Sequence, residues 1–445
     1  MSFPFRGLPP LRHPGPPPAT TDVVVLGGGI VGVMTAWFLA ERGLRVVLCE
    51  KGRIGAEQSG RNWGWVRQQG RDPAELPIMV EALRIWKSLA QTCGAALGFR
   101  QTGVMYLART KAEIAGFEGW MTHARAHDLD TRVLTGAEVG QHIKGQGGWI
   151  GGLLTPSDAR AEPWVAVPIL AAGAVAKGAV IVEGCAVRRL DLAAGRVAGV
   201  VTEAGRIACA QVVVAGGAWS RLFLGAHGVN IPQLSVLASV AATGPMPEVY
   251  AGNAADDVFA FRRRADGGYS IAPKAEHDFF PGRDDVASFR NFLPILKRDW
   301  RSTHVRAIAP KGYPDAWGTP RRWSADTVSP FERMRILDPA PNMASIGRVQ
   351  DAFARAFPAL GRPRLRAAWG GMIDTMPDVV PVIDRAPLDG LVIATGMSGH
   401  GFGIGPGIGR VVADLVAGQA PGHDLHRFRL SRFTDGSLVA PGPTL

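Results

Sequence analysis

Apolar runs punctuated by glycine mark the first predicted elements of the chain. Residues 23–26 are four consecutive apolar positions, which predict a short strand buried on both faces. A glycine turn and a helical segment follow, and residues 45–49 form a second strand-like run that ends at Glu50. This order of strand, turn, helix, strand and acid predicts one unit of a parallel α/β sheet.

Periodicity also predicts elements further along the chain. Apolar residues at helical spacing predict three helices, at about 74–93, 111–127 and 164–177. Alternating or continuous apolar positions predict strands, at 103–108, 180–192, 197–202 and 212–215. Residues 234–308 have mostly β character, including 267–272. The end returns to α/β character, with a strand at 391–395, a glycine-rich turn and a helix at 408–417.

Length and composition favour a globular protein of two domains. The 445 residues are too many for one small core, and 47% hydrophobic with 20% charged residues is typical of a soluble globular enzyme. No apolar run reaches the length of a membrane span. Residues 1–20 are rich in proline and lack the apolar core of a signal peptide, so we expect an extended or mobile arm. Cys49, Cys93, Cys185 and Cys209 form no C-x-x-C pair, which favours a reducing cytoplasm and argues against a metal site.

The net charge of +11 narrows the possible partners. The basic runs are short, 262–264 and 321–322, and no aromatic residues interleave with them, so we expect no nucleic-acid binding. Weak peripheral contact with an anionic membrane surface stays open, beside the simpler interpretation of a solvated basic surface.

The turn after the first strand has the spacing of a dinucleotide site. Gly27, Gly29 and Gly32 fill the G-x-G-x-x-G pattern, in which the glycines permit a sharp turn, approach of a pyrophosphate and close packing of the helix. The helix N-terminus favours the anion, and Glu50 stands where a carboxylate binds an adenosine ribose. The unit does not distinguish FAD from NAD.

Three further segments favour a flavin. Residues 212–220 predict a strand that enters a turn of small residues, and SGRNWG at 59–64 is a polar loop about ten residues after Glu50. Residues 394–410 predict a strand, a glycine turn and a helix start. Placed against a flavin ring, this helix start would bring N–H groups to the pyrimidine edge, where negative charge builds on reduction.

At these blocks the chain resembles the FAD-dependent D-amino acid oxidase-like enzymes, which include glycine oxidase, sarcosine oxidase and the D-amino acid dehydrogenases. The resemblance runs from about residue 22 to residue 417. It rests on GGGIVG, Glu50, SGRNWG, VVVAGGAWS, WGGMIDTMPDVVPVI and GMSGHGFGIGPGIG. It implies FAD, and oxidation of a C–N bond in an amino acid or related amine.

The resemblance also implies the fold class. We expect an α/β protein, α+β overall, in which a glutathione-reductase-type, Rossmann-like FAD domain carries an inserted substrate domain with an antiparallel sheet. The expected boundaries are an N-terminal arm at 1–20, an FAD domain at 21–90, 150–225 and 340–430, a substrate domain at 91–149 and 226–339, and a C-terminal tail at 431–445.

Residues that match the family's blocks are expected to contact the cofactor. They cover the pyrophosphate turn, the ribose acid, the loop across the flavin, a backbone contact to adenine, the second cofactor strand and the turn at the pyrimidine ring. They are Gly27, Gly29, Ile30, Val31, Gly32, Glu50, Lys51, Ser59, Arg61, Asn62, Trp63, Val187, Ala215, Gly216, Trp219, Gly399, His400, Gly401, Phe402 and Gly403.

Four residues are candidates for the catalytic and substrate-binding roles. His400 is either a polar group beside the flavin or a structural histidine. Tyr269 is either a substrate contact or an ordinary sheet residue. Arg67 either reaches the substrate cavity or lies on the surface. Arg264 shares a predicted strand with Arg262, and one of the arginines there is a candidate to bind a substrate carboxylate.

The chain departs from the family at its carboxylate-binding arginine. Glycine oxidase-like members have an arginine after the W-x-G block, where this chain has Ile373. Residues 67 and 262–264 are the candidate replacements. Gly371 stands where some members attach FAD to a cysteine, and residues 51–65 contain no histidine, so we expect non-covalent FAD. Asp374 is expected either to pair with an amine or to cap a turn.

The resulting hypothesis is a flavin-dependent amino acid dehydrogenase or oxidase. Hydride passes from the substrate to flavin N5, and the imine is hydrolysed to a keto acid plus an amine or ammonia. Electrons leave to O2 or to a quinone or other electron carrier. The alternatives are an electron-transfer subunit without its own amine substrate and an NAD(P)-dependent reductase. The expected location is the cytoplasm, with peripheral contact at the inner membrane surface left open.

Overall fold

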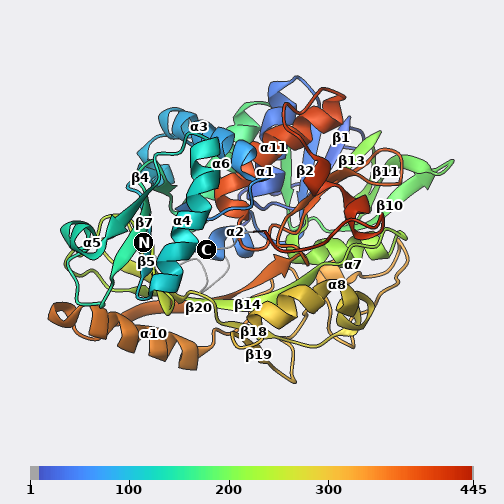
Figure 1. Ribbon diagram of the computed structural model, residues 1–445. Helices are drawn as coiled ribbons and strands as arrows, with labels where there is room; N and C mark the ends of the chain where they lie inside the picture. Colours follow the sequence, from blue (N-terminus) through green and yellow to red (C-terminus); the bar gives the residue numbers. More distant parts are fainter. Residues whose placement is uncertain (1–9, 443–445) are drawn as a thin grey trace.

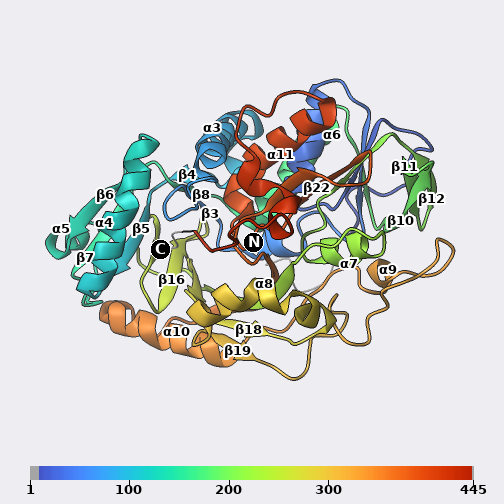
Figure 2. The same ribbon diagram turned by 45° about the vertical axis from the view of Figure 1, so that its right-hand side comes forward.

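The computed structural model describes residues 10–442, which form two sheets with helices on their outer faces (Figure 1). Residues 1–9 of the expected arm and residues 443–445 of the expected tail lie outside the described residues. Figure 2, turned by 45°, shows the helix-covered first sheet around β22 beside the larger sheet that includes β16 and β18.

The first sheet contains the predicted dinucleotide unit. Its six strands follow the order β21-β22-β13-β1-β2-β9, and all neighbours are parallel except β21 and β22. The strands are β1 (Val23–Leu26), β2 (Val46–Glu50), β9 (Val180–Glu183), β13 (Gln211–Val214), β21 (Val382–Arg385) and β22 (Leu391–Thr395). Successive residues of β1 pack on opposite faces, which places this strand in the core of the domain.

Different layers cover the two faces of this sheet. Val23 and Val25 pack under α1 (Ile30–Glu41), α3 (Leu76–Cys93), α6 (Pro163–Ala176) and α11 (Gly401–Ala417). Val24 and Leu26 pack toward a three-stranded sheet, β10 (Val187–Ala193), β11 (Arg196–Thr202) and β12 (Gly205–Ala208), and toward α7 (Ser220–Gly225).

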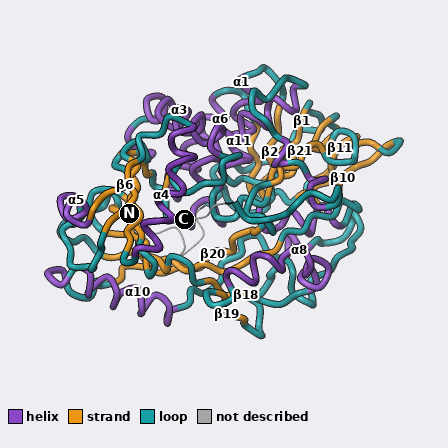
Figure 3. Tube along the Cα trace, in the orientation of Figure 1, coloured by secondary structure: helices purple, strands orange, loops and turns teal. Residues whose placement is uncertain are grey.

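The second sheet is mostly antiparallel and is the larger band of strands in Figure 3. Its order is β19-β18-β14-β17-β16-β15-β5-β7-β6, and β20 pairs with β14 along its whole length. The strands are β5 (Val104–Ala108), β6 (Arg132–Thr135), β7 (Gly151–Thr155), β14 (Leu234–Thr243), β15 (Asn253–Ala255), β16 (Phe259–Arg263), β17 (Tyr269–Pro273), β18 (His277–Phe279), β19 (Thr303–Val305) and β20 (Leu365–Thr375).

Short elements and outer helices complete the fold. A small sheet joins β3 (Trp65–Val66), β4 (Arg100–Gln101) and β8 (Ala159–Arg160). The remaining α-helices are α2 (Gln58–Arg61), α4 (Lys111–Ala126), α5 (Gly136–His142), α8 (Arg283–Asp299), α9 (Pro330–Arg333) and α10 (Met343–Ala356). Capping boxes begin α4 and α5, where Thr110 and Thr135 each accept a hydrogen bond from the N–H of a glutamate three residues later.

The structure places parts of two expected FAD-domain segments in the larger sheet. The expected FAD domain includes residues 150–225 and 340–430, but β7, α10 and β20 belong to the larger sheet. Helix α10 lies along the outer face of that sheet (Figure 1). Ile346 and Phe353 on its apolar face belong to the same buried cluster as the aromatic residues Phe261 and Tyr269 of the sheet. The periodicity of α10 is clear in the sequence, but the sheet that it covers is not encoded locally. The other domain boundaries stay a prediction.

Two helices also differ from the sequence-based expectation. The last helix begins at Gly401 instead of residue 408, because its glycines face neighbouring helices and do not form a turn: a Cβ at Gly409 would lie 2.6 Å from the Cβ of Met34. Residues 283–299 form α8 in a region expected to be mostly β-structure. Only Ser288 and Phe292 of α8 are buried, so its apolar pattern does not mark a core-facing helix.

The described part of the N-terminal arm is docked on the first domain. Glu183 accepts hydrogen bonds from the backbone N–H groups of Arg12 and His13, at 2.6 and 3.1 Å. Ala208 donates its N–H to the carbonyl of Ala19. Within residues 10–442, no helix is long and apolar enough to cross a membrane, and no group of three histidine, cysteine or acidic side chains could hold a metal ion.

Candidate functional site

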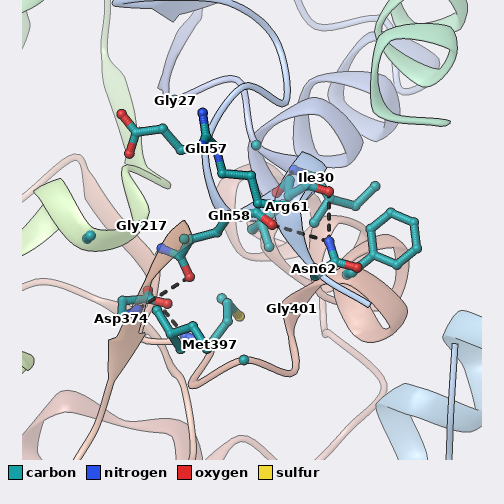
Figure 4. Close-up of a pocket in the computed structure, with 18 of the residues that line it drawn as sticks. Gly27, Ile30, Glu57, Gln58, Arg61, Asn62, Gly217, Asp374, Met397 and Gly401 are labelled. Atoms are coloured by element: carbon teal, nitrogen blue, oxygen red, sulfur yellow. Dashed lines mark hydrogen bonds between the residues drawn. The ribbon is translucent and has the colours of Figure 1, made fainter. Parts of the chain in front are cut away.

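A cavity of about 400 Å³ runs from the glycine turn of the first sheet to the inner face of the second sheet. Gly27 and Ile30 line one end, and Asp374 and Met397 line a wall from the second sheet and the turn before α11 (Figure 4). Every residue expected to contact the cofactor lines this cavity except Gly32.

The glycine turn leaves room for an anion. Gly27 has φ of +106°, and a Cβ on it would lie 2.5 Å from the carbonyl oxygen of Ala215. A Cβ on Gly29 would meet only the Ser59 hydroxyl, at 3.1 Å. Gly32 lies beneath the turn, where a Cβ would be 2.0 Å from the Gly27 carbonyl oxygen. Helix α1 begins there without a side-chain cap or an acidic first turn, so its N-terminal dipole favours a phosphate.

Glu50 is held at the end of β2 by backbone donors. Its two carboxylate oxygens accept hydrogen bonds from the N–H groups of Gly28 and Gly52, at 2.7 and 2.6 Å. Burial nevertheless raises the pKa of Glu50 above its ordinary value, with Lys51 opposing the shift. Cys185 and Val187 line the same end of the cavity.

The loop after β2 is fixed by its own polar side chains. The Ile30 N–H donates to the Ser59 hydroxyl at 2.9 Å, and Asn62 donates to the carbonyl of Ser59 at 2.8 Å (Figure 4). Arg61 is buried and ion-paired with Asp338 at 2.5 Å. These contacts show Arg61 and Asn62 shaping the loop that lines the cavity.

Asp374 caps the turn that precedes α11. Its Oδ2 accepts hydrogen bonds from the N–H groups of Gly396 and Met397, at 2.8 and 3.3 Å. Burial raises the pKa of Asp374, and these N–H groups oppose the shift. Of the two roles expected for Asp374, its contacts are those of the turn cap.

His400 stands at the start of α11 and lines the cavity. Its Nδ1 lies 3.4 Å from Oε2 of the fully buried Glu75, which also pairs with Arg71 at 3.4 Å. Burial lowers the pKa of His400, and Glu75 only partly offsets this effect. Burial alone would raise the pKa of Glu75, but His400 and Arg71 hold it below its ordinary value. The imidazole is therefore a neutral polar group at pH 7.

The substrate candidates separate into two groups. Arg67 lines the cavity, its guanidinium lies 5.9 Å from the ring centroid of Tyr106, and it donates a hydrogen bond to the carbonyl of Gln69. Tyr269 and Arg264 do not line the cavity, and of the two roles left open for Tyr269 its position is that of the sheet residue. The Tyr269 hydroxyl accepts a hydrogen bond from the N–H of Val249 at 2.9 Å within the core of the second sheet.

The basic strand β16 has structural roles. Arg262 is fully buried and forms two 3.0 Å hydrogen bonds with Glu162, while Arg264 is ion-paired with Asp266 at 2.9 Å. Unpaired burial of a guanidinium is costly, so these pairs stabilise the fold.

Sequence reasoning missed several residues of the cavity wall. Arg71, Tyr106 and Lys274 line the cavity, and Glu75 pairs with Arg71; all four lie in segments with no recognised motif. The sequence signal for Tyr106 and Lys274 was their position on or directly after a predicted strand. That position does not reveal which side chains face the cavity.

Comparison with known proteins identifies the family. A family profile described as FAD dependent oxidoreductase matches residues 22–415. The chain belongs to this family. It is 26% identical over 440 residues to the sarcosine oxidase subunit beta of Rhizobium meliloti (strain 1021), covering 97% of this chain and 92% of that protein.

Solved structures agree with the family and fold. L-Amino acid deaminase from Proteus myxofaciens, in complex with anthranilate, superposes with a TM-score of 0.91 at 30% identity, covering 97% of each chain. Glycine oxidase from Geobacillus kaustophilus has the same fold, with a TM-score of 0.74 at 20% identity over 93% of this chain and 99% of that one. The α/β fold class with an inserted sheet is confirmed.

The cofactor of this family member is FAD, and the cavity fits it. The open space over Gly29, the uncapped start of α1 and the buried Glu50 suit the pyrophosphate and ribose of a dinucleotide. Because the family is FAD-dependent, the alternative of an NAD(P)-dependent reductase is not favoured. Individual contacts to FAD, and its non-covalent attachment, stay predictions.

Proposed function

We propose that this protein uses FAD to oxidise the C–N bond of an amine that carries a carboxylate. The observation that supports this substrate class is Arg67, a half-buried cation at the sheet end of the cavity with no carboxylate within 4 Å among residues 10–442. The names of the similar proteins point to the same class, namely sarcosine and L-amino acids.

The residues of the chain position and enclose the substrate, while bound FAD supplies the hydride acceptor. Trp63, Trp65 and Ile373 line the sheet end of the cavity and exclude water from it. Arg67 orients the carboxylate, and the neutral imidazole of His400 offers a polar group without adding charge. The expected products are a keto acid and an amine or ammonia.

Anaerobic reduction of the purified holoprotein tests this proposal. A panel of D-, L- and N-methyl amino acids is compared with the corresponding decarboxylated amines, and loss of flavin colour is recorded. At least one amino acid should bleach the flavin faster than its amine. Bleaching by a chemical reductant but by no amine would favour the electron-transfer subunit, and equal rates with and without the carboxylate would contradict the substrate class.

Substitution of Arg67 tests the orienting role. Arg67→Ala should raise KM for the amino acid by about 10- to 100-fold, since a charge-assisted hydrogen bond contributes roughly 1.5–3 kcal/mol. Arg263→Ala is the matched control, because Arg263 lies on β16 outside the cavity and bonds to the Met246 carbonyl. An unchanged KM in Arg67→Ala would remove the residue from the substrate site.

The electron acceptor and a surface contact complete the proposal. We propose O2 or a quinone-type carrier as the electron acceptor. Measurements of oxygen uptake and of quinone reduction distinguish the two.

We also propose weak contact with anionic membranes through α8, where Val286, Phe289 and Leu293 form an exposed apolar stripe beside Arg290 and Lys297. Co-sedimentation with phosphatidylglycerol vesicles but not phosphatidylcholine vesicles is expected, and Phe289→Glu should abolish it. Equal binding to both vesicles, or none, would contradict this contact.

A further inference from the structure

A second cation, on a different segment from Arg67, lines the sheet end of the cavity. Lys274 directly follows β17, its backbone N–H donates to the carbonyl of Val258 at 3.2 Å, and its side chain lines the cavity. Its Nζ lies 5.0 Å from the ring centroid of Tyr106, the ring that Arg67 also approaches. Two cations from separate segments therefore converge on one aromatic ring.

Lys274, like Arg67, has no carboxylate oxygen within 4 Å of its cationic group among the described residues. Lys51 pairs with Glu57, Arg61 with Asp338 and Arg71 with Glu75. Nζ of Lys274 has neither an ion pair nor a hydrogen bond among residues 10–442. Burial lowers the pKa of Lys274 and the charge of Arg67 adds to this effect, while the carboxylates of Glu113, Asp256 and Asp257 oppose it. Lys274 is half-buried, and an anion in the cavity would stabilise its partly dehydrated ammonium group.

Tyr106 adds a hydroxyl donor to the ring that both cations approach. Its side chain is 4% exposed and lines the cavity, and its hydroxyl has no hydrogen-bond partner among the described residues. Burial raises the pKa of Tyr106, so the phenol keeps its proton at neutral pH. The hydroxyl belongs to a residue that lines the cavity, so it is available to donate a hydrogen bond to a ligand there.

The nearest acid on the loop side is already engaged. Asp158 accepts hydrogen bonds from the N–H groups of Gln68 and Gln69, at 2.7 and 3.2 Å, and burial raises its pKa to about 6. The carbonyl of Gln69 in turn holds the guanidinium of Arg67. Asp158 thus positions the loop of Arg67 without forming an ion pair with either cation.

We propose that Lys274, Arg67 and the Tyr106 hydroxyl form an anion subsite that binds the substrate carboxylate. This inference rests on the proposed function and names the residues that replace the missing arginine. The carboxylate lies against the wall formed by β5 and the end of β17, away from β20, where Ile373 offers no charge. Specificity for a carboxylated amine then depends on Lys274 as well as on Arg67.

Ligand binding to the holoprotein tests the subsite without requiring turnover. The probe is anthranilate, and its decarboxylated counterpart is aniline. Each is titrated against the flavin absorbance of the wild type, Lys274→Met, Lys274→Arg and Tyr106→Phe. Lys87→Met on the exposed side of α3 is the matched control.

Lys274→Met should raise the Kd for anthranilate by about 10- to 100-fold, as expected for loss of a charge-assisted contact. Its Kd for aniline should stay within about twofold of the wild type, and Lys274→Arg should recover most of the anthranilate affinity. Tyr106→Phe should raise the anthranilate Kd by about three- to tenfold, since a hydroxyl donor contributes less than an ionic one.

Equal anthranilate affinity in the wild type and Lys274→Met would overturn the subsite, and so would an equal loss of aniline affinity. If Lys274→Met does not retain FAD, the Kd values of Tyr106→Phe and Lys274→Arg for anthranilate and aniline are compared with those of the wild type. An unchanged anthranilate Kd in Tyr106→Phe would then overturn the subsite. A wild type that binds anthranilate through Lys274 but is reduced by no amine would leave the subsite standing and overturn the proposed function. If amino acids reduce the flavin and Lys274→Met has an unchanged KM, the proposed function stands and the subsite is overturned.

Discussion

Single residues determine how closely the chain approaches its cofactor and substrate. Gly29 keeps the space over the start of α1 open, and Glu75 holds His400 beside the cavity. At this scale, chemistry depends on small side chains as much as on charged ones, because one added methyl group fills the space that a phosphate needs.

Gly29→Val should yield protein without FAD. Its side chain would project into the cavity beside the Ser59 hydroxyl, in the space expected to hold the pyrophosphate. Flavin absorbance after purification measures the outcome. Gly140→Val is the control, since Gly140 is exposed on α5 and a Cβ there would have no atom within 4 Å. Retention of a full complement of FAD by Gly29→Val would contradict the assignment.

His400→Ala should shift the flavin midpoint potential or the visible spectrum while leaving the fold intact. The reason is the loss of a neutral polar group at the start of α11, near the expected pyrimidine edge. Potentiometric titration and circular dichroism provide the two readouts, with the exposed His426→Ala as control. If potential, spectrum and turnover all match the wild type, His400 has only a structural role.

At the scale of elements, glycines in α11 allow it to pack closely against α1 and α3. A Cβ on Gly405 would lie 2.7 Å from the Ile30 side chain, and one on Gly407 would lie 2.6 Å from the carbonyl oxygen of Ile78. The same glycines that resemble a turn in the sequence therefore belong to a helix. Close packing fixes the start of α11, and with it the position of His400.

Gly409→Ala should lower the free energy of unfolding by about 1–3 kcal/mol, because its Cβ would overlap Met34 in a filled interface. Gly119→Ala is the paired control on exposed α4, where no atom lies within 4 Å and alanine should stabilise the helix by roughly 0.5–1 kcal/mol. Urea unfolding of both variants measures the difference. Equal effects at the two positions would show that α11 does not depend on this contact.

At the scale of the whole molecule, two sheets enclose one cavity, and neither sheet alone forms the site. The first sheet provides the cradle from Gly27 to Val31, and the second provides Gly371, Ile373 and the wall near Lys274. Cys49 and Cys185 line the cavity beside Glu50 and Val187, at the end expected to hold the adenosine.

FAD should be released intact by acid precipitation. Gly371 stands at the position where some family members attach the flavin, and the cysteines of the cavity lie at its opposite end. The supernatant should contain all of the flavin, measured by absorbance, and the pellet should be colourless. Flavin that remains in the washed pellet would demonstrate a covalent bond and identify the prediction as wrong.

Much of the fold followed from local pattern. Helices α4 and α6 lie within a residue or two of their predicted positions, because each has clear periodicity and a defined start. Helix α8 and the first turns of α11 were not predicted, since an exposed apolar stripe and a glycine-rich segment do not have the periodicity of a core-facing helix.

The amino-acid sequence alone was enough to predict the dinucleotide cradle, because the strand, turn, helix and acid lie within about thirty residues and their geometry is local. Which cations face the cavity, by contrast, depends on how the two sheets pack. The sequence pattern does not distinguish Arg262 from Arg67 as a candidate to bind a carboxylate. In the structure Arg262 pairs with Glu162, 100 positions away, whereas Arg67 and Lys274 have no carboxylate within 4 Å among the described residues. Whether a charge is free depends on contacts between distant segments, and these exist only once the two sheets have packed together.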